Sequence, residues 1–130
     1  ETGLAEMAGK FLQNSVSSLP SFFIFLIIFM CVIFSTELTS NTATANIILP
    51  IIISMASEMN FSPFFLAMGV SISCSMAFML PVATPPNAII YGSGKVDIKD
   101  MLGMGLGLNL IFGFVLAFMI WMYNYLNFNN

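Results

Sequence analysis

The chain has 130 residues, of which 58% are hydrophobic and 7% are charged, and its formal net charge is −3. Three basic and six acidic side chains cannot cover the surface of a soluble domain of this size. The few lysines form no basic patch, so a nucleic-acid partner is not expected. Long apolar runs without charge are typical of segments that lie in a lipid bilayer. The composition therefore predicts an all-α, multi-pass integral membrane protein.

The residues that most enzymes use for catalysis are missing or scattered. There is no histidine, and the carboxylates are spread along the chain, so no set of nucleophile, base and acid can be assembled. Cys31 and Cys74 both lie deep in apolar segments. This position predicts free thiols that pack as small hydrophobic side chains, rather than a disulfide or a metal site. We therefore do not expect an enzyme.

Residues 1–19 are expected to form an amphipathic arm helix in the membrane interface. Within residues 3–14 the apolar side chains recur at helical spacing, namely Leu4, Met7, Ala8, Phe11 and Leu12. Polar side chains occupy the opposite face, namely Glu6, Lys10, Gln13 and Asn14. A helix on the aqueous side that packs on a neighbour would show the same pattern. The chain does not begin with Met and its first residues lack a basic region, so we expect no signal peptide and a chain that begins within a longer protein.

Residues 20–57 contain two apolar segments on either side of a polar stretch. Pro20–Phe34 is nearly all apolar, but its fifteen residues give only about 22 Å of helix. A full span needs about 20 residues. Asn46–Met55 is a second short, mostly apolar segment, and residues 35–46 between the two read STELTSNTATAN. One broken span or a re-entrant hairpin with its polar tip at 35–46 would both explain this pattern, and the short arms favour the hairpin.

Residues 61–91 are expected to form a discontinuous transmembrane helix. Phe61–Leu80 is a full-length apolar segment that is followed by the break PVATPPN at 81–87. The apolar character resumes from Ala88 to Tyr91. Pro85 restricts the residue before it to extended backbone, so the helix should open at Thr84.

A hydrophilic loop at 92–100 precedes the last expected transmembrane helix at 101–126. The positive-inside rule places Lys95 and Lys99 in the cytoplasm and the C-terminus outside. A hairpin at 20–57 then places Lys10 outside as well. Within the last helix, Gly103, Gly107 and Gly113 are expected to let another helix approach closely. The glycines do not follow a strand and no acidic residue follows them, so a nucleotide-binding loop is not expected.

The two polar breaks offer oxygen ligands at comparable depths in the expected bilayer. Non-helical backbone is tolerated there only where protein buries it or where it lines an aqueous cavity, so a shared polar site is expected. Half-helix N-termini suit an anion, whereas unwound carbonyls suit a hard cation such as Na⁺. Secondary transporters combine these features near the bilayer midplane. Glu37 is a candidate for function, for capping the loop, or for a protonated state.

The two breaks resemble those of the divalent-anion/sodium symporter family, which carries dicarboxylates, citrate or sulfate. The matching residues are Ser40-Asn41-Thr42 within TELTSNTATANIILPI (36–51) and Ala83–Ile89 within MLPVATPPNAII (79–90). The similarity runs from about residue 20 to residue 126. Family members have two inverted repeats, each with a hairpin and a broken helix, and this chain resembles the second repeat. The N-terminal half of the same transporter is then a partner, and the family's scaffold implies a homodimer.

The resemblance implies a sodium-coupled symporter of dicarboxylates such as succinate, which works by an elevator-like motion in the plasma membrane. It assigns the substrate to five residues of the two breaks, Ser40, Asn41, Thr42, Thr84 and Pro85. It assigns one Na⁺ to Thr36, Thr39, Asn41, Ala83 and Asn87. A sodium-independent exchanger of the same fold, a pore-lining channel subunit and a purely structural subunit remain as alternatives.

Overall fold

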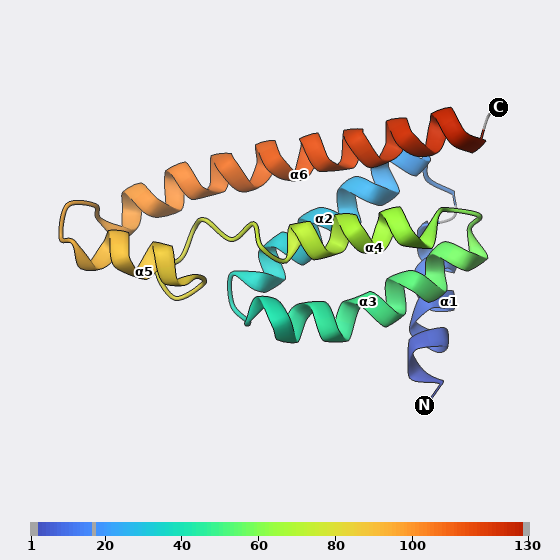
Figure 1. Cartoon of the computed structure of the whole chain (residues 1–130), viewed down its shortest axis with the longest axis horizontal. Coiled ribbons are helices and arrows are strands. Elements are labelled where there is room, and N and C mark those ends of the chain that lie inside the picture. Colours follow the sequence, from blue (N-terminus) through green and yellow to red (C-terminus); the bar gives the residue numbers. More distant parts are fainter. Residues whose placement is uncertain (1–2, 17, 129–130) are drawn as a thin grey trace.

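The computed structural model describes residues 3–16 and 18–128, and in this part of the chain the regular elements are all helices, without strands (Figure 1). Its helices are α1 (Leu4–Val16), α2 (Ser21–Thr36), α3 (Asn41–Glu58), α4 (Pro63–Ser73), α5 (Pro85–Gly92) and α6 (Ile98–Phe128). This confirms the all-α class. Within the described part, only α6 is long and apolar enough to cross a bilayer, while α2 and α4 are shorter apolar helices.

Helices α2 and α3 run antiparallel and are joined by a turn of four residues, 37–40 (Figure 1). Pro20 precedes α2 with extended backbone, and Ser40 begins α3 as its N-cap, where the side-chain oxygen accepts a hydrogen bond from the Ala43 amide at 3.1 Å. The turn is therefore shorter than the polar stretch at 35–46. The polar residues on either side of the turn belong to helix ends, because the Ser40 cap starts α3 early.

The helix expected over Phe61–Leu80 ends much earlier than the sequence predicts. Helix α4 stops at Ser73, and residues 74–84 are not helical. Pro85 and Pro86 lie at the first positions of α5, where a missing N–H costs nothing, and Thr84 is the N-cap. The break predicted at 81–87 is thus wrong in position. It covers 74–84, because side chains from other helices hydrogen-bond the backbone of this segment and replace its helical bonds.

The core lies where α2, α4 and α6 meet, with α3 covering α2 and α4 from below in Figure 1. Phe25, Phe29, Leu66, Val70 and Ala117 are completely buried there. Gly113 of α6 lies against Met30 of α2, as expected for a glycine that permits close helix packing. A Cβ added at Gly103 or Gly107 would meet no atom of the described residues within 4 Å, so within this part of the chain these two glycines contact no other helix.

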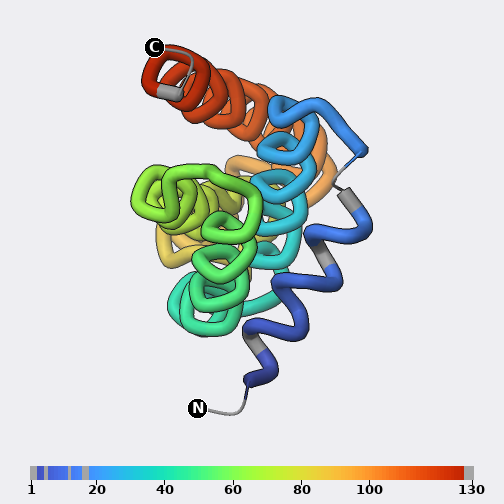
Figure 2. Tube along the Cα trace, turned by 90° about the vertical axis from the view of Figure 1, so that its right-hand side faces the viewer, coloured from blue at the N-terminus to red at the C-terminus, as the bar shows by residue number. Residues whose placement is uncertain are grey.

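Helix α1 crosses the open end of the α2–α3 pair rather than running along it (Figures 1 and 2). It packs on α3 through Gly9, which lies against Ser54, and Gln13 donates to the Glu58 carbonyl at 3.5 Å. Its apolar face points away from this contact, since Leu4, Met7 and Phe11 are 66–71% exposed. The side chain of Leu12 lies outside the described part. Helix α1 is thus packed on α3, while its apolar face is left uncovered by the described residues.

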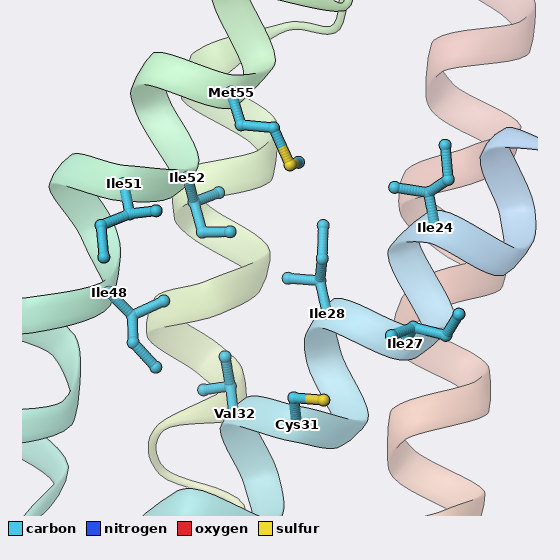
Figure 3. A pocket seen from close by; sticks show the side chains of 9 residues that line it. All are labelled: Ile24, Ile27, Ile28, Cys31, Val32, Ile48, Ile51, Ile52 and Met55. Atoms are coloured by element: carbon cyan, nitrogen blue, oxygen red, sulfur yellow. The ribbon is translucent and has the colours of Figure 1, made fainter. Parts of the chain in front are cut away.

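A pocket of about 200 Å³ lies between the two arms of the α2–α3 pair (Figure 3). Its walls are six isoleucines of α2 and α3 together with Cys31, Val32 and Met55. All of these side chains are apolar. The pocket therefore has no ligand for an ion or a carboxylate, and the polar chemistry of the chain lies at the tip of the pair instead.

The glycines of α6 give a test of this packing. A Cβ at Gly105 would lie 2.4 Å from the Phe78 carbonyl oxygen and 2.6 Å from the Met79 Cα, which are backbone atoms that cannot move aside cheaply. We expect Gly105→Ala to destabilise the protein by about 1–3 kcal/mol through overpacking. Gly103→Ala, which meets no atom, should be neutral or stabilising by up to about 1 kcal/mol. Thermal unfolding of the purified full-length protein measures both, and a Gly105→Ala variant as stable as Gly103→Ala would contradict the close approach.

Candidate functional site

The end of α2 and the start of α3 form the first half of the candidate site. Thr36 is the last residue of α2 and is fully buried, and Asn41 is the first residue of α3. The Thr36 hydroxyl oxygen lies 2.5 Å from Asn41 Oδ1 and 2.9 Å from the carbonyl oxygen of Cys74, where the non-helical segment begins. These three oxygens, which we call the Thr36 cluster, therefore join the tip of the α2–α3 pair to the start of the non-helical segment 74–84.

The Thr36 cluster has more acceptors than protons. A threonine hydroxyl carries one proton, so it can donate to the Asn41 oxygen or to the Cys74 carbonyl but not to both. Turning the Asn41 amide over would let its nitrogen donate to the hydroxyl. A hard cation would also complete the set, because such cations prefer hydroxyl, amide and carbonyl oxygens. The residues present thus fit a small cation, whereas no group of His, Cys, Asp and Glu in the described part could hold a transition metal.

Thr39 lies in the turn between the two helices and is exposed. Its hydroxyl donates to the Ser35 carbonyl at 2.8 Å and lies 2.5 Å from the hydroxyl of the buried Thr44. Since the Thr39 proton is already used, Thr44 is the donor in the second contact. Thr39 is therefore held by hydrogen bonds at the tip, but it belongs to a separate hydroxyl pair and not to the Thr36 cluster.

The carboxylate of Glu37 links the tip to the middle of the non-helical segment. It is 4% exposed, and its two oxygens accept from the Met79 amide at 2.9 Å and the Leu80 amide at 3.0 Å. The side-chain amide of Asn109, on α6, donates to the same carboxylate at 2.7 Å. All three donors are neutral N–H groups, and both oxygens of the Glu37 side chain act as acceptors. Of the roles expected for Glu37, these contacts are those of loop capping.

Asn87 holds the same segment from the side of α5. It is 7% exposed, and its Nδ2 donates to the carbonyls of Ala77 at 2.9 Å and Leu80 at 3.0 Å. Its backbone N–H bonds the Thr84 hydroxyl oxygen at 3.4 Å, which caps the helix. The amide nitrogen of Asn87 is therefore occupied, and only Oδ1 is left as a ligand for a cation.

The remaining predicted residues lie at the first turns of α3 and α5. Ser40 and Thr42 are exposed, and the Ser40 side chain already caps α3. Thr84 and Pro85 line an open hollow, together with Pro81, Val82, Ala88 and Tyr91. Ala83 is half-buried, and its N–H bonds the Leu80 carbonyl at 3.2 Å.

The two groups of predicted ligands are connected indirectly. The hydrogen bonds between the tip and residues 74–84 run through Thr36 to Cys74 and through Glu37 to Met79 and Leu80. In the described part, no hydrogen bond joins Asn41 directly to Ala83 or Asn87. The structure therefore brings Thr36 and Asn41 together, and it places Asn87 on the other side of the same segment.

Sequence reasoning missed two features of the site, the Cys74 carbonyl and Asn109. A backbone carbonyl cannot be recognised as a ligand from residue types. Asn109 could have been recognised, because it is a single amide in the middle of an apolar helix, and such a residue is rarely without a partner or a function. The Ser73 hydroxyl beside Cys74 is also fully buried, and it has no hydrogen-bond partner among the described residues.

Comparison with known proteins identifies the family. The profile of a family described as sodium:sulfate symporter transmembrane region matches residues 1–128. A sodium-dependent dicarboxylate transporter of Staphylococcus saprophyticus is 42% identical over 111 residues, which are 85% of this chain and 21% of that protein. An uncharacterized transporter of Haemophilus influenzae is 46% identical over 120 residues, or 89% of this chain and 26% of that protein.

A sodium-dependent dicarboxylate transporter of Staphylococcus aureus is 40% identical over 121 residues, which are 93% of this chain and 23% of that protein. The chain thus spans between a fifth and about a quarter of the length of these relatives. The family match and these relatives confirm the resemblance that the two polar motifs indicated. The chain belongs to the sodium:sulfate symporter family.

Proposed function

We propose that the chain is the second-repeat part of a sodium-coupled symporter of dicarboxylates such as succinate. The observation that carries the proposal is the Thr36 cluster, in which the Thr36 hydroxyl, Asn41 Oδ1 and the Cys74 carbonyl meet where the tip reaches the non-helical segment. The relatives named as sodium-dependent dicarboxylate transporters support the same reading. The N-terminal half of the transporter would supply the other half of the site.

Sodium is proposed to bind between the tip and the second break. Asn41 Oδ1 and the Thr36 hydroxyl are the ligands that the geometry supports best, since they lie 2.5 Å apart without enough protons for all neighbouring acceptors. Thr39 and Ala83 would contribute backbone carbonyls, and Asn87 would contribute Oδ1. Neutral oxygen ligands are well suited to Na⁺, which must be released on the other side of the membrane.

The substrate is proposed to bind where α3 and α5 begin. Ser40, Asn41 and Thr42 would contact one carboxylate at the start of α3, and Thr84 and Pro85 would form the opposite wall at the start of α5. The three lysines of the chain are Lys10, Lys95 and Lys99, and none of them belongs to either of the two motifs. An anion would therefore be held by hydroxyls, free N–H groups, helix dipoles and the bound Na⁺.

In the proposed arrangement α6 spans the plasma membrane and the α2–α3 pair is a re-entrant hairpin, with its tip near the bilayer midplane. The turn between α5 and α6 carries Lys95 and lies in the cytoplasm, so the C-terminal end of α6 lies outside. The exposed apolar face of α1 rests in the outer interface as the arm to a scaffold, through which two transporters would form a homodimer. The site would cross the membrane by an elevator-like motion of this body.

Asn41→Ala tests the sodium site. In the full-length protein it removes the amide from the Thr36 cluster, and we expect Na⁺-dependent succinate uptake to fall to the level seen without Na⁺. Asn46→Ala is the matched control, because Asn46 lies five residues further along α3 and is exposed. Uptake of labelled succinate into proteoliposomes measures both variants. Na⁺-dependent uptake by Asn41→Ala would contradict the assignment of Asn41 to the sodium site.

Thr36→Val tests the role of the hydroxyl. Valine keeps the shape of the side chain but removes the oxygen next to Asn41 and Cys74, so we expect the Na⁺ concentration for half-maximal uptake to rise roughly threefold to tenfold. Thr36→Ser keeps the hydroxyl and should stay near the unmodified protein. Equal half-saturation in the valine and serine variants would exclude the hydroxyl as a ligand.

The anion is tested by comparing succinate, citrate and sulfate uptake with and without Na⁺. We expect saturable, Na⁺-dependent uptake of succinate, together with exchange of labelled for unlabelled succinate across the membrane. Succinate exchange that is indifferent to Na⁺ would favour an exchanger, and steep conductance without exchange would favour a channel. Transport of sulfate but not succinate would move the substrate class from dicarboxylate to sulfate.

A further inference from the structure

Three consecutive amides of the non-helical segment are held by only two side chains. The N–H of Phe78 donates to Asn109 Oδ1 at 3.3 Å, and those of Met79 and Leu80 donate to Glu37 at 2.9 and 3.0 Å. Asn109 and Glu37 are themselves joined by a hydrogen bond of 2.7 Å. The backbone at 78–80 is therefore fixed by one connected unit, which we call the Glu37–Asn109 pair.

Helix α6 approaches the non-helical segment closely at Gly105, and Asn109 lies within hydrogen-bonding distance of the Phe78 amide. Gly105 lies one turn before Asn109 on the same face of the helix, and it allows the Phe78 carbonyl to come within 2.4 Å of where a Cβ would be. Glycine thus provides the close approach, and asparagine one turn later provides both a donor and an acceptor. The face of α6 that meets the non-helical segment therefore makes defined contacts with it. From the sequence alone, α6 was expected only to be a transmembrane span with packing glycines.

The Glu37–Asn109 pair acts on the same segment as the proposed sodium ligand Thr36. Thr36 and Glu37 are adjacent residues at the end of α2, and the first bonds the start of the segment at Cys74 while the second bonds its middle at 79–80. A shift of the segment relative to the tip would therefore strain both contacts.

We propose that Glu37 and Asn109 are positioning residues for sodium binding, which couple α6 to the tip and set the geometry of the Thr36 cluster. The inference rests on the proposed function, because it names the residues that tune the sodium site. Neither side chain is placed as a ligand. Their effect reaches Na⁺ through the backbone at 78–80, whose segment begins at the Cys74 carbonyl that the Thr36 hydroxyl contacts.

Glu37→Gln and Asn109→Ala test the proposal in the full-length protein. A glutamine turns one acceptor oxygen into a donor that faces N–H groups, and alanine removes both bonds of Asn109. We expect the Na⁺ concentration for half-maximal succinate uptake to rise roughly tenfold in each variant. The KM for succinate at saturating Na⁺ should change by less. If the variants give less protein in the membrane but keep the half-saturating Na⁺ concentration of the unmodified protein, Glu37 and Asn109 have a merely structural role. This result would overturn the proposal.

Two matched control variants change the same residue types, a glutamate and an asparagine, at exposed positions. Glu58→Gln changes an exposed carboxylate at the end of α3, and Asn127→Ala changes an exposed asparagine of α6 whose amide donates to its own helix at Tyr123. Both should keep the half-saturating Na⁺ concentration of the unmodified protein. A comparable rise in the controls would mean that any loss of charge or amide has this effect, and would also overturn the proposal.

An exchange of the two groups tests their direct coupling. Asn109→Asp alone places two carboxylates in contact, and we expect it to weaken Na⁺ dependence most. Combined with Glu37→Gln, the pair again has an amide donor facing a carboxylate acceptor, with the order reversed. We expect the double variant to recover part of the lost Na⁺ affinity relative to Asn109→Asp. A double variant whose loss equals the product of the two single losses would contradict a direct pair.

A measurement without transport separates this proposal from the proposed function. The Cys74 side chain is only 2% exposed and lies at the start of the segment. Alkylation by a membrane-permeant maleimide, read by mass spectrometry of the Cys74 peptide, should be faster in Glu37→Gln and Asn109→Ala than in the two controls. If the unmodified protein shows no Na⁺-dependent uptake, the proposed function fails. If Cys74 labelling is unchanged in both variants, the positioning of the segment fails.

Discussion

The structure depends on how the non-helical backbone at 74–84 is hydrogen-bonded inside an apolar protein. A buried N–H or C=O without a hydrogen bond costs free energy, and in lipid no water can replace the missing partner. Here the chain meets this constraint with three side chains, since Glu37 and Asn109 bind the amides of 78–80 and Asn87 binds the carbonyls of Ala77 and Leu80. The break is therefore a fixed element, held by side chains from the end of α2, the start of α5 and the middle of α6.

The same solution creates the site. Once 74–84 is held beside the tip, the Cys74 carbonyl points at the Thr36 hydroxyl, and α5 begins at Thr84 on the other side of the segment. Two helix N-termini and a set of uncharged oxygens then come to one region without a single lysine or arginine. In the proposed symporter, this arrangement would let the anion depend on the bound cation, because these two motifs carry no fixed positive side chain of their own.

Sequence reasoning found the motifs of the site but not the shape of the break. The Ser40-Asn41-Thr42 and Thr84–Asn87 motifs are read directly from residue types, because caps and prolines act locally. The end of α4 at Ser73 is not local, since it depends on Glu37 and Asn109, which are far away in the chain. An apolar run such as Phe61–Leu80 looks helical as long as the partners that replace its helical bonds are unknown.

A carboxylate suits position 37 better than an amide of the same size because of the number of hydrogen-bond donors that this position faces. The position faces three N–H donors, from Met79, Leu80 and Asn109, and needs only acceptors. Glutamine would bring one donor against them, because its side-chain nitrogen donates and does not accept. Position 37 also adjoins Thr36, so the side chain that holds 79–80 and the hydroxyl that bonds Cys74 belong to neighbouring residues. In the proposed symporter, a change in the position of the break would therefore act on the sodium ligands through the end of α2.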